Sequence, residues 1–264
     1  MIEARELVIG YGAKTIGRDI MLAVAPGEVL CLLGPNGSGK TTLFKTLLGL
    51  IPARGGTIRI AGDLLADLDR RSVAQRIAYV PQAHTAHFPF RVVDMVTMGR
   101  TAHLGLFAKP GSEDHARARD ALALLGISAL GDIEYTRISG GQRQLVLIAR
   151  ALAQDAPAIV MDEPTASLDF GNQVLVLRQV RRLADRGLAV VLSTHDPHHA
   201  ISLGDRVAFL HEGRVVAQGR PADVLTADRL QAVYGVSVTI ETLQTGQTVC
   251  VADFETATST KPSS

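Results

Sequence analysis

The chain has 264 residues and a balanced charge, with 27 Lys and Arg against 26 Asp and Glu. This length supports one domain with a self-sufficient hydrophobic core, and the net charge of +1 gives no general attraction to nucleic acid or anionic lipid. The two cysteines, Cys31 and Cys250, lack the spacing of a disulfide framework or a zinc site, which favours a reduced, cytoplasmic setting.

Membrane insertion is not expected from the sequence itself. No apolar run approaches the roughly 18 residues of a membrane span, and Glu3 and Glu6 are atypical of a signal peptide. We therefore expect any membrane role to come through a partner protein.

Strand-like and helix-like segments alternate along the chain. Residues 1–29 contain apolar runs separated by glycines, which predicts short strands. Further strands are predicted at 29–33, 56–60, 77–80, 158–161 and 188–192, and a hairpin at 207–210 and 214–218. Helices are predicted at 92–100, 113–125, 145–152 and 172–186, and 63–76 can hold a short one. This alternation predicts an α/β fold with a mainly parallel sheet covered by helices on both faces.

One domain is expected over residues 1–254. Its core comprises about 1–87 and 155–240, a helical part about 88–154, and a C-terminal extension about 241–254. Alternating residues within 231–254 predict a small terminal strand pair, whose role the sequence leaves open. Residues 255–264, rich in Thr and Ser, are predicted to form a disordered tail.

The stretch Gly34–Thr42 fits the pattern G-x-x-x-x-G-K-[ST], between a predicted strand and a predicted helix. Its glycines let backbone N–H groups turn inward around a phosphate, and the positive end of the following helix attracts the anion. Lys40 is expected to reach the β- and γ-phosphates of a nucleoside triphosphate, and Thr41 to hold Mg²⁺. The predicted nucleotide-binding residues of this loop are Gly34, Pro35, Asn36, Gly37, Ser38, Gly39, Lys40, Thr41 and Thr42.

Two carboxylates, Asp162 and Glu163, directly follow the apolar strand predicted at 158–161. Open α/β sheets bind their ligands at the carboxyl ends of the strands. We expect Asp162 to hold Mg²⁺ through water and Glu163 to act as general base toward the attacking water.

The segment Ile138-Ser139-Gly140-Gly141-Gln142 resembles the signature sequence of ABC-type ATPases. The resemblance covers most of the chain, and the only departure is Ile138 where leucine is common, a change of equal volume. It implies a P-loop NTPase core with an N-terminal antiparallel β subdomain and an inserted α-helical signature subdomain. It also implies ATP as substrate, with Mg²⁺.

The same resemblance implies a symmetric homodimer, because in the family each signature closes on the nucleotide of the other copy. Ser139, Gly140 and Gly141 stand at a helix start, where a hydroxyl and free N–H groups can cap a γ-phosphate. The further residues that the resemblance implies are Gln142 in the signature, Tyr11 stacking on adenine, Gln82 joining Mg²⁺ to the helical part, Ser167, Leu168 and Asp169 at the dimer contact, and His195 at the γ-phosphate.

A second interpretation exists for the histidines. His195 and His199 have the i, i+4 spacing of a metal-binding helix face, but Pro197 lies between them and a strand ends just before His195. We therefore expect His195 to point into the nucleotide site, and we do not expect the two histidines to form a metal site. His84 and His87 are predicted to be surface loop residues.

Residues 98–105 resemble the helical segment of ATPases that serve importers of iron chelates, haem and corrinoids, and residues 169–173 indicate the same. Molybdate importers share much of this pattern, so the solute stays open. The resemblance implies a separate membrane permease, an indirect link to a solute-binding protein, and a place at the cytoplasmic face of the inner or plasma membrane. Two alternatives are a soluble ABC ATPase acting as an assembly or regulatory module, and an exporter subunit.

Overall fold

The structure is a computed structural model that describes residues 1–82, 89–105 and 107–253. Its centre is a six-stranded sheet with the order β10-β9-β3-β8-β7-β6. The strands are β3 (Val29–Leu33), β6 (Ile77–Val80), β7 (Ala158–Met161), β8 (Ala189–Thr194), β9 (Arg206–His211) and β10 (Arg214–Gly219). All neighbours pair in parallel except β9 and β10, which form the predicted hairpin, so the expected α/β fold with a mainly parallel sheet is confirmed.

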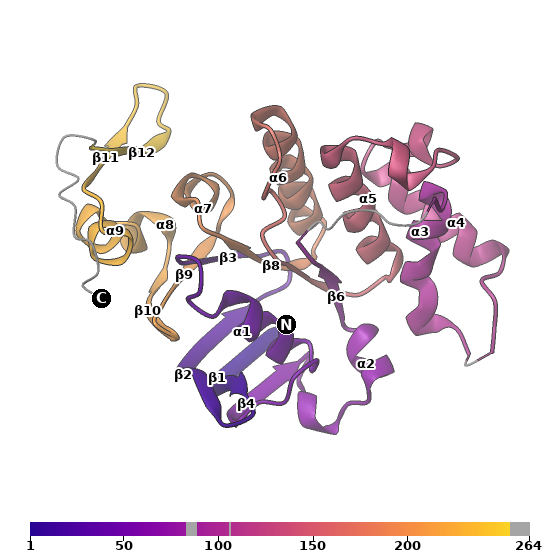
Figure 1. The fold of residues 1–264 in the computed structure, drawn as a ribbon, viewed down its shortest axis with the longest axis horizontal. Coiled ribbons are helices and arrows are strands. Elements are labelled where there is room, and N and C mark those ends of the chain that lie inside the picture. The colour runs from indigo at the N-terminus through magenta and orange to yellow at the C-terminus, as the bar shows by residue number, and fades with distance from the viewer. Residues whose placement is uncertain (83–88, 106, 254–264) are drawn as a thin grey trace.

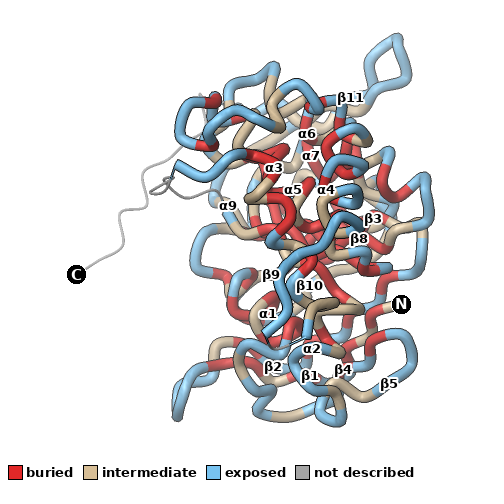
Figure 2. Tube along the Cα trace, turned by 90° about the vertical axis from the view of Figure 1, so that its right-hand side faces the viewer, coloured by how far each residue is buried: buried red, intermediate tan, exposed pale blue. Residues whose placement is uncertain are grey.

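Both faces of this sheet are buried, and β3 shows how. Val29, Cys31 and Leu33 belong to one hydrophobic core, while Leu30 and Leu32 belong to a second on the opposite face. A strand buried on both faces has no polar alternation, which explains its continuous apolar run. Figure 2 shows this buried band running through the middle of the molecule.

Different helices pack against the two faces of the central sheet. Helix α1 (Lys40–Leu47) packs between the six-stranded sheet and the N-terminal sheet (Figure 1). The opposite face carries α5 (Gly140–Ala153), α6 (Phe170–Asp185) and α7 (Pro197–Leu203). Phe44 of α1 and Phe209 of β9 are fully buried, one in each core.

The N-terminal residues form a four-stranded antiparallel sheet with the order β2-β1-β4-β5. Its strands are β1 (Ile2–Tyr11), β2 (Lys14–Val24), β4 (Gly55–Ile60) and β5 (Asp63–Leu64). The prediction of short strands over 1–29 was wrong, because β1 and β2 have 10 and 11 residues. Gly10 and Gly17 lie inside these strands: a Cβ there would lie 2.1 Å from Lys14 O and 2.5 Å from Gly213 O. They permit close backbone approach and do not end the strands.

Between β5 and β6 the chain forms η1 (Leu65–Asp67) and α2 (Arg70–Ala74). The short helix expected within 63–76 is thereby confirmed. The side chain of Asp69 caps α2 by accepting a hydrogen bond of 2.7 Å from the Ser72 amide.

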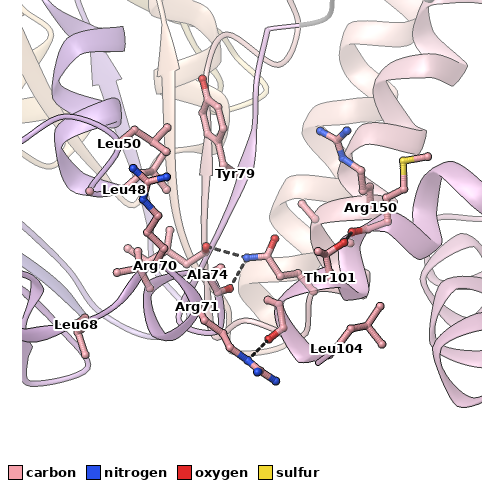
Figure 3. A pocket seen from close by; sticks show the side chains of 18 of the residues that line it. Leu48, Leu50, Leu68, Arg70, Arg71, Ala74, Tyr79, Thr101, Leu104 and Arg150 are labelled. Atoms are coloured by element: carbon pink, nitrogen blue, oxygen red, sulfur yellow. Dashed lines mark hydrogen bonds between the residues drawn. The ribbon is translucent and has the colours of Figure 1, made fainter. Parts of the chain in front are cut away.

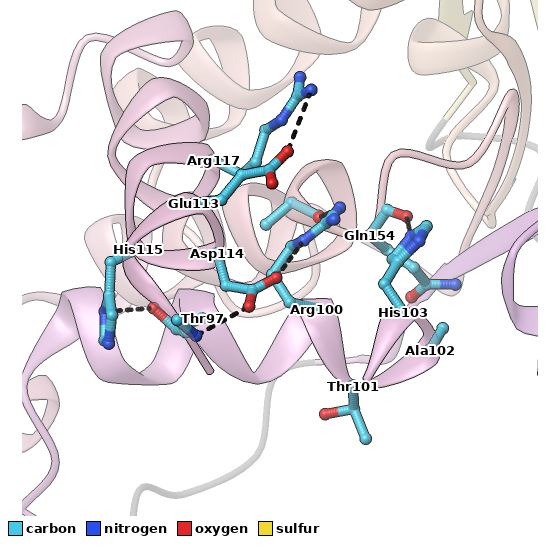
Figure 4. Close-up of polar contacts among 12 residues, drawn as sticks. Thr97, Arg100, Thr101, Ala102, His103, Glu113, Asp114, His115, Arg117 and Gln154 are labelled. Atoms are coloured by element: carbon cyan, nitrogen blue, oxygen red, sulfur yellow. Dashed lines mark hydrogen bonds and ion pairs between the residues drawn. The ribbon is translucent and has the colours of Figure 1, made fainter. Parts of the chain in front are cut away.

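The helical part, on the right in Figure 1, contains α3 (Val92–Thr97), η2 (Met98–His103), α4 (Ser112–Leu124), η3 (Ser128–Leu130), η4 (Tyr135–Arg137) and α5. The buried Arg100 joins these elements: its Nε donates to Asp114 Oδ1 (3.1 Å) and its Nη1 to Ala153 O (2.9 Å). Bonds from the Gly111 amide and Arg100 hold the pKa of Asp114 below its usual range. His103 Nε2 lies 2.7 Å from Gln154 O (Figure 4). These contacts tie η2 to α4 and to the end of α5.

At the opposite end of the molecule, α8 (Pro221–Val224) and α9 (Ala227–Tyr234) lead to the two-stranded sheet β11 (Val238–Thr242) and β12 (Thr248–Ala252). The predicted terminal strand pair is therefore confirmed. The predicted tail at 255–264 and the loop histidines His84 and His87 lie outside the described residues. Among the residues that the structure describes, no helix has the length and apolar character to cross a bilayer.

A matched pair of phenylalanine variants tests the core. We expect Phe44→Ala to lower the free energy of unfolding by about 3–5 kcal/mol, because it empties a fully buried site. Phe107 is 94 % exposed, so Phe107→Ala should leave stability within about 0.5 kcal/mol of the wild type. Chemical denaturation measures both, and equal losses would contradict the assignment of the core.

Candidate functional site

The glycine loop between β3 and α1 has the backbone geometry of an anion-binding turn. Gly37 and Gly39 have positive φ values of 80° and 106°, which side-chain-bearing residues rarely adopt. Gly39 is the N-cap residue of α1, and no side chain in the described part of the chain caps this helix start, so the N–H groups of the first turn are available to an anion. The buried Ser38 Oγ has no hydrogen-bond partner within the described residues. A buried hydroxyl without a partner, beside an uncapped helix start, fits a bound phosphate.

Lys40, the first residue of α1, lies at the centre of the site. It is 5 % exposed, and its Nζ donates to Gly34 O (2.7 Å) and Pro35 O (3.0 Å). The same Nζ lies 3.4 Å from Glu163 Oε1. An ammonium with carbonyl and carboxylate partners is held in place at little desolvation cost, and it can exchange the carbonyls for phosphate oxygens.

Asp162 and Glu163 follow β7 and point to different partners. Asp162, 5 % exposed, accepts a hydrogen bond of 2.7 Å from Ser193 Oγ, and this hydroxyl in turn accepts one of 2.9 Å from the Glu163 amide. The Glu163 backbone has a positive φ of 46°, an uncommon conformation that turns its side chain toward Lys40. One buried serine thus fixes both carboxylate-bearing residues.

His195 follows β8, and its Nδ1 lies 3.4 Å from Glu163 Oε2. The imidazole is 55 % exposed, so one side of it stays open to a ligand. The neighbouring His199 has other surroundings: its Nδ1 lies 3.2 Å from Thr194 Oγ1 and 3.3 Å from Thr165 Oγ1. Burial lowers the pKa of His199 and so favours the neutral ring, while the nearby Asp196 carboxylate opposes this shift. The two histidines therefore have separate partners.

The signature residues stand at the start of α5, as the sequence predicts. Ser139 is the N-cap residue: its Oγ accepts from the Gln142 amide (3.2 Å), and Gln142 Oε1 accepts from the Ser139 amide (3.0 Å). Gly140 is exposed, and a Cβ there would meet no atom of the described residues within 4 Å. A Cβ on the buried Gly141 would lie 2.2 Å from Asn172 Oδ1. Only a glycine lets α5 approach α6 this closely.

The segment Ser167-Leu168-Asp169 precedes α6. Ser167 has a positive φ of 61°. Asp169 caps α6 by accepting 2.9 Å and 2.8 Å hydrogen bonds from the Asn172 amide and side chain. The bond from the Asn172 backbone amide is the largest cause that holds the pKa of Asp169 below its usual range. Asn172 therefore joins this segment to the signature.

The remaining predicted site residues lie at the margins. Tyr11 is 46 % exposed at the end of β1, on the hairpin whose Ile16 lies against Gly39 of the phosphate loop. Thr41 and Gln82 are exposed, Gln82 two residues after the end of β6, and Thr42 is buried. The hydroxyl of Thr41, the amide of Gln82 and the carboxylate of Asp162 are the hard oxygen donors that Mg²⁺ prefers. This donor set fits the expected ion.

Sequence reasoning missed Ser193 and Asn172. Ser193 bonds Asp162 across 31 positions, and Asn172 lies against Gly141 of another helix, so no local pattern identifies these two contacts. The only signal was position: Ser193 lies at the carboxyl end of a central strand, where ligands gather.

A groove with a volume of about 770 Å³ opens between the core and the helical part. Figure 3 shows its side chains, which come from the end of α1, from α2 and β6, and from η2 and α5. Gln154 Nε2 donates to Ala74 O and to Ile77 O (3.0 Å), and Arg71 Nε donates to Ala102 O (3.0 Å). These bonds bridge the two walls. Leu50, Leu65, Leu68, Met98 and Leu104 give the groove much of its apolar lining.

The phosphate loop on a parallel sheet, with carboxylates after a neighbouring strand, defines a P-loop NTPase. The family model described as ABC transporter matches residues 18–166. The chain is 45 % identical over 237 residues to an ABC transporter ATP-binding protein of Haemophilus influenzae, covering 90 % of each. It is 40 % identical over 240 residues to the hemin import ATP-binding protein HmuV of Thermobifida fusca, covering 91 % of this chain and 84 % of that protein.

Solved structures agree. A chain of an ABC transporter described as of metal-chelate type, in an inward-facing conformation, has a TM-score of 0.86 and 32 % identity over 97 % of this chain and 98 % of that one. The dimeric ATP-binding cassette MJ0796 with ADP and Pi has a TM-score of 0.71 and 26 % identity over 84 % and 99 %. The chain belongs to the ABC transporter ATP-binding family, and it is an ATPase.

The hydrogen bond from Ser193 to Asp162 is expected to support Mg²⁺ binding. We expect Ser193→Ala to raise the Mg²⁺ concentration needed for half-maximal ATP hydrolysis and to lower kcat about three- to tenfold, because Asp162 and the Glu163 amide lose their shared partner. A Mg²⁺ titration of the steady-state rate measures this. The exposed Ser128→Ala is the control, and an unchanged titration curve for Ser193→Ala would contradict the role.

Proposed function

We propose that this chain is the ATP-hydrolysing subunit of an ABC importer that couples ATP binding, dimer closure and hydrolysis to uptake of a metal chelate through a separate permease. The line of contacts from Lys40 through Glu163 to His195 carries the hydrolytic part of this proposal. The printed names of the hemin import and metal-chelate relatives support the import part.

In the proposed mechanism, Lys40 leaves the carbonyls of Gly34 and Pro35 and binds the β- and γ-phosphates. Glu163, released from its ion pair, accepts a proton from the attacking water, and His195 contacts the γ-phosphate. Thr41, Gln82 and Asp162 would hold Mg²⁺, which supplies charge neutralisation at the phosphates. Phosphoryl transfer depends mainly on positioning and charge stabilisation, and these residues provide both.

A homodimer completes the site in this proposal. Ser139, Gly140 and Gly141 would cap the γ-phosphate bound by a second copy, and the MJ0796 cassette shows that a structure with this fold dimerises. Ser167, Leu168 and Asp169 would contact the partner. Phe170, next to Asp169, is 82 % exposed, and an apolar side chain of this exposure gains from burial in a dimer.

We propose that the permease binds in the groove between the core and the helical part, and that this contact holds the chain at the cytoplasmic face of the membrane. Its apolar lining suits a short amphipathic segment of the partner. In this arrangement the core (about 1–87 and 155–240) binds nucleotide, and the helical part (about 88–154) transmits its movement. The extension at about 241–254 has no role in this scheme.

The solute is proposed to be an iron-siderophore, haem or corrinoid, delivered by a solute-binding protein. Two of the names support this range: hemin import for the Thermobifida fusca relative and metal-chelate type for the structural neighbour. Molybdate remains within the proposal because its importers share the pattern at 98–105. The ATPase itself does not touch the solute.

The general-base assignment predicts the behaviour of Glu163→Gln. We expect this variant to bind ATP and form an ATP-dependent dimer while hydrolysing ATP at least about 100-fold more slowly, because a neutral amide accepts no proton. Size-exclusion chromatography with ATP and a phosphate-release assay measure the two properties. Near-normal turnover would remove Glu163 from the mechanism.

The importer assignment is tested by purifying the tagged chain from gently solubilised native membranes and identifying the bound proteins by mass spectrometry. Recovery of a polytopic permease supports import and supplies the chain to test with iron chelates, haem, corrinoid and molybdate. Recovery of only soluble proteins, from a preparation that preserves other membrane complexes, would favour an assembly or regulatory module.

The docking surface is tested with a matched pair of leucines. We expect Leu50→Asp to abolish permease recovery while the isolated ATPase stays within about twofold of the wild type, because Leu50 is 62 % exposed in the groove. Leu243→Asp, 43 % exposed in the C-terminal hairpin, is the control. Full permease recovery by Leu50→Asp would move the docking surface elsewhere.

A further inference from the structure

Helix α9, near the C-terminus, reaches the hydrolytic site. Its last residue, Tyr234, donates a hydrogen bond of 3.1 Å from Oη to the backbone carbonyl of His195. The imidazole of the same residue lies 3.4 Å from Glu163. The two residues are 39 positions apart, and none of the motifs in the sequence includes Tyr234.

The tyrosine ring is held independently of its hydroxyl. It packs against Phe209 of β9, with ring centroids 6.1 Å apart and the planes tilted by 58°. Leu230, one turn earlier in α9, is 1 % exposed in the same core, and Gly235 ends the helix with a positive φ of 71°. The hydroxyl is therefore aimed at the His195 peptide by packing that would survive its removal.

The hydroxyl is also a dependable donor. Burial, together with the nearby carboxylates of Asp196 and Glu163, raises the pKa of Tyr234, so the O–H proton is retained at neutral pH. The peptide unit between His195 and Asp196 is held at both ends. Thr194 Oγ1 accepts a hydrogen bond of 3.0 Å from its N–H group, which belongs to Asp196, and Tyr234 Oη donates to its carbonyl, which belongs to His195. Tyr234 therefore adds the second of the two bonds that fix this peptide.

We propose that Tyr234 is a positioning residue for ATP hydrolysis, whose hydroxyl fixes the His195 peptide and thereby the imidazole that faces Glu163. The inference rests on the role proposed for His195. It makes the last helix of the described chain part of the hydrolytic machinery, although this helix contributes nothing to phosphate binding.

The test uses Tyr234→Phe in the full chain. This variant keeps the ring on Phe209 and removes only the hydroxyl, so we expect an unchanged melting temperature and unchanged ATP affinity. We expect kcat to fall about three- to tenfold with KM within about twofold, as for the loss of one positioning hydrogen bond. Tyr135→Phe, at a buried tyrosine of the helical part, is the matched control and should keep the wild-type rate.

A double-mutant cycle separates positioning from a structural tie. In a His195→Ala background, Tyr234→Phe should cause no further loss of kcat, because the positioned ring is already absent. An equal loss in both backgrounds, or a wild-type kcat in Tyr234→Phe alone, would overturn the inference. Wild-type turnover by His195→Ala would instead remove the proposed role of His195, so the two failures are distinguishable.

Discussion

The ion pair between Lys40 and Glu163 depends on the parallel order of the sheet, and the rest of the site depends on that pair. Strands β3, β8 and β7 are neighbours, and their carboxyl ends lead to Lys40, His195 and Glu163. Because parallel strands end at one edge, three segments far apart in sequence converge there. Removing the charge of Glu163 would leave the buried Lys40 ammonium with only the carbonyls of Gly34 and Pro35, so the ion pair contributes to the resting geometry of the loop.

The sequence was sufficient where chemistry is local. The phosphate loop and the strand before Asp162 were predicted because their residues act within one short segment. Ser193 was not, because its contacts require the register of β8 beside β7, where Met161 pairs with Leu192. Gly141 belongs to a recognised motif, yet the physical need for glycine arises from Asn172 of another helix. Contacts of this kind exist only after the elements pack.

Glycine was also the source of the error in the N-terminal sheet. In sequence, a glycine inside an apolar run is compatible with a turn and with close backbone approach. Gly10 and Gly17 allow close backbone approach, because Lys14 O and Gly213 O of neighbouring segments lie close to where their Cβ atoms would be. Gly213 belongs to the β9–β10 turn, so the N-terminal sheet is fitted against the central one at backbone distance. This approach between two sheets cannot be predicted from the local sequence around Gly17.

Strand β6 connects the nucleotide side of the molecule with the groove. Its last residue, Val80, accepts a hydrogen bond of 2.9 Å from the Asp162 amide, and Gln82 follows two positions later. At its other end, Ile77 accepts from Gln154 of the helical part, and Ile77 and Tyr79 both line the groove. This edge strand has four residues, and all four pair in parallel with β7. The groove and the proposed Mg²⁺ ligand Gln82 are therefore connected by one short continuous segment, from Ile77 through Val80 to Gln82.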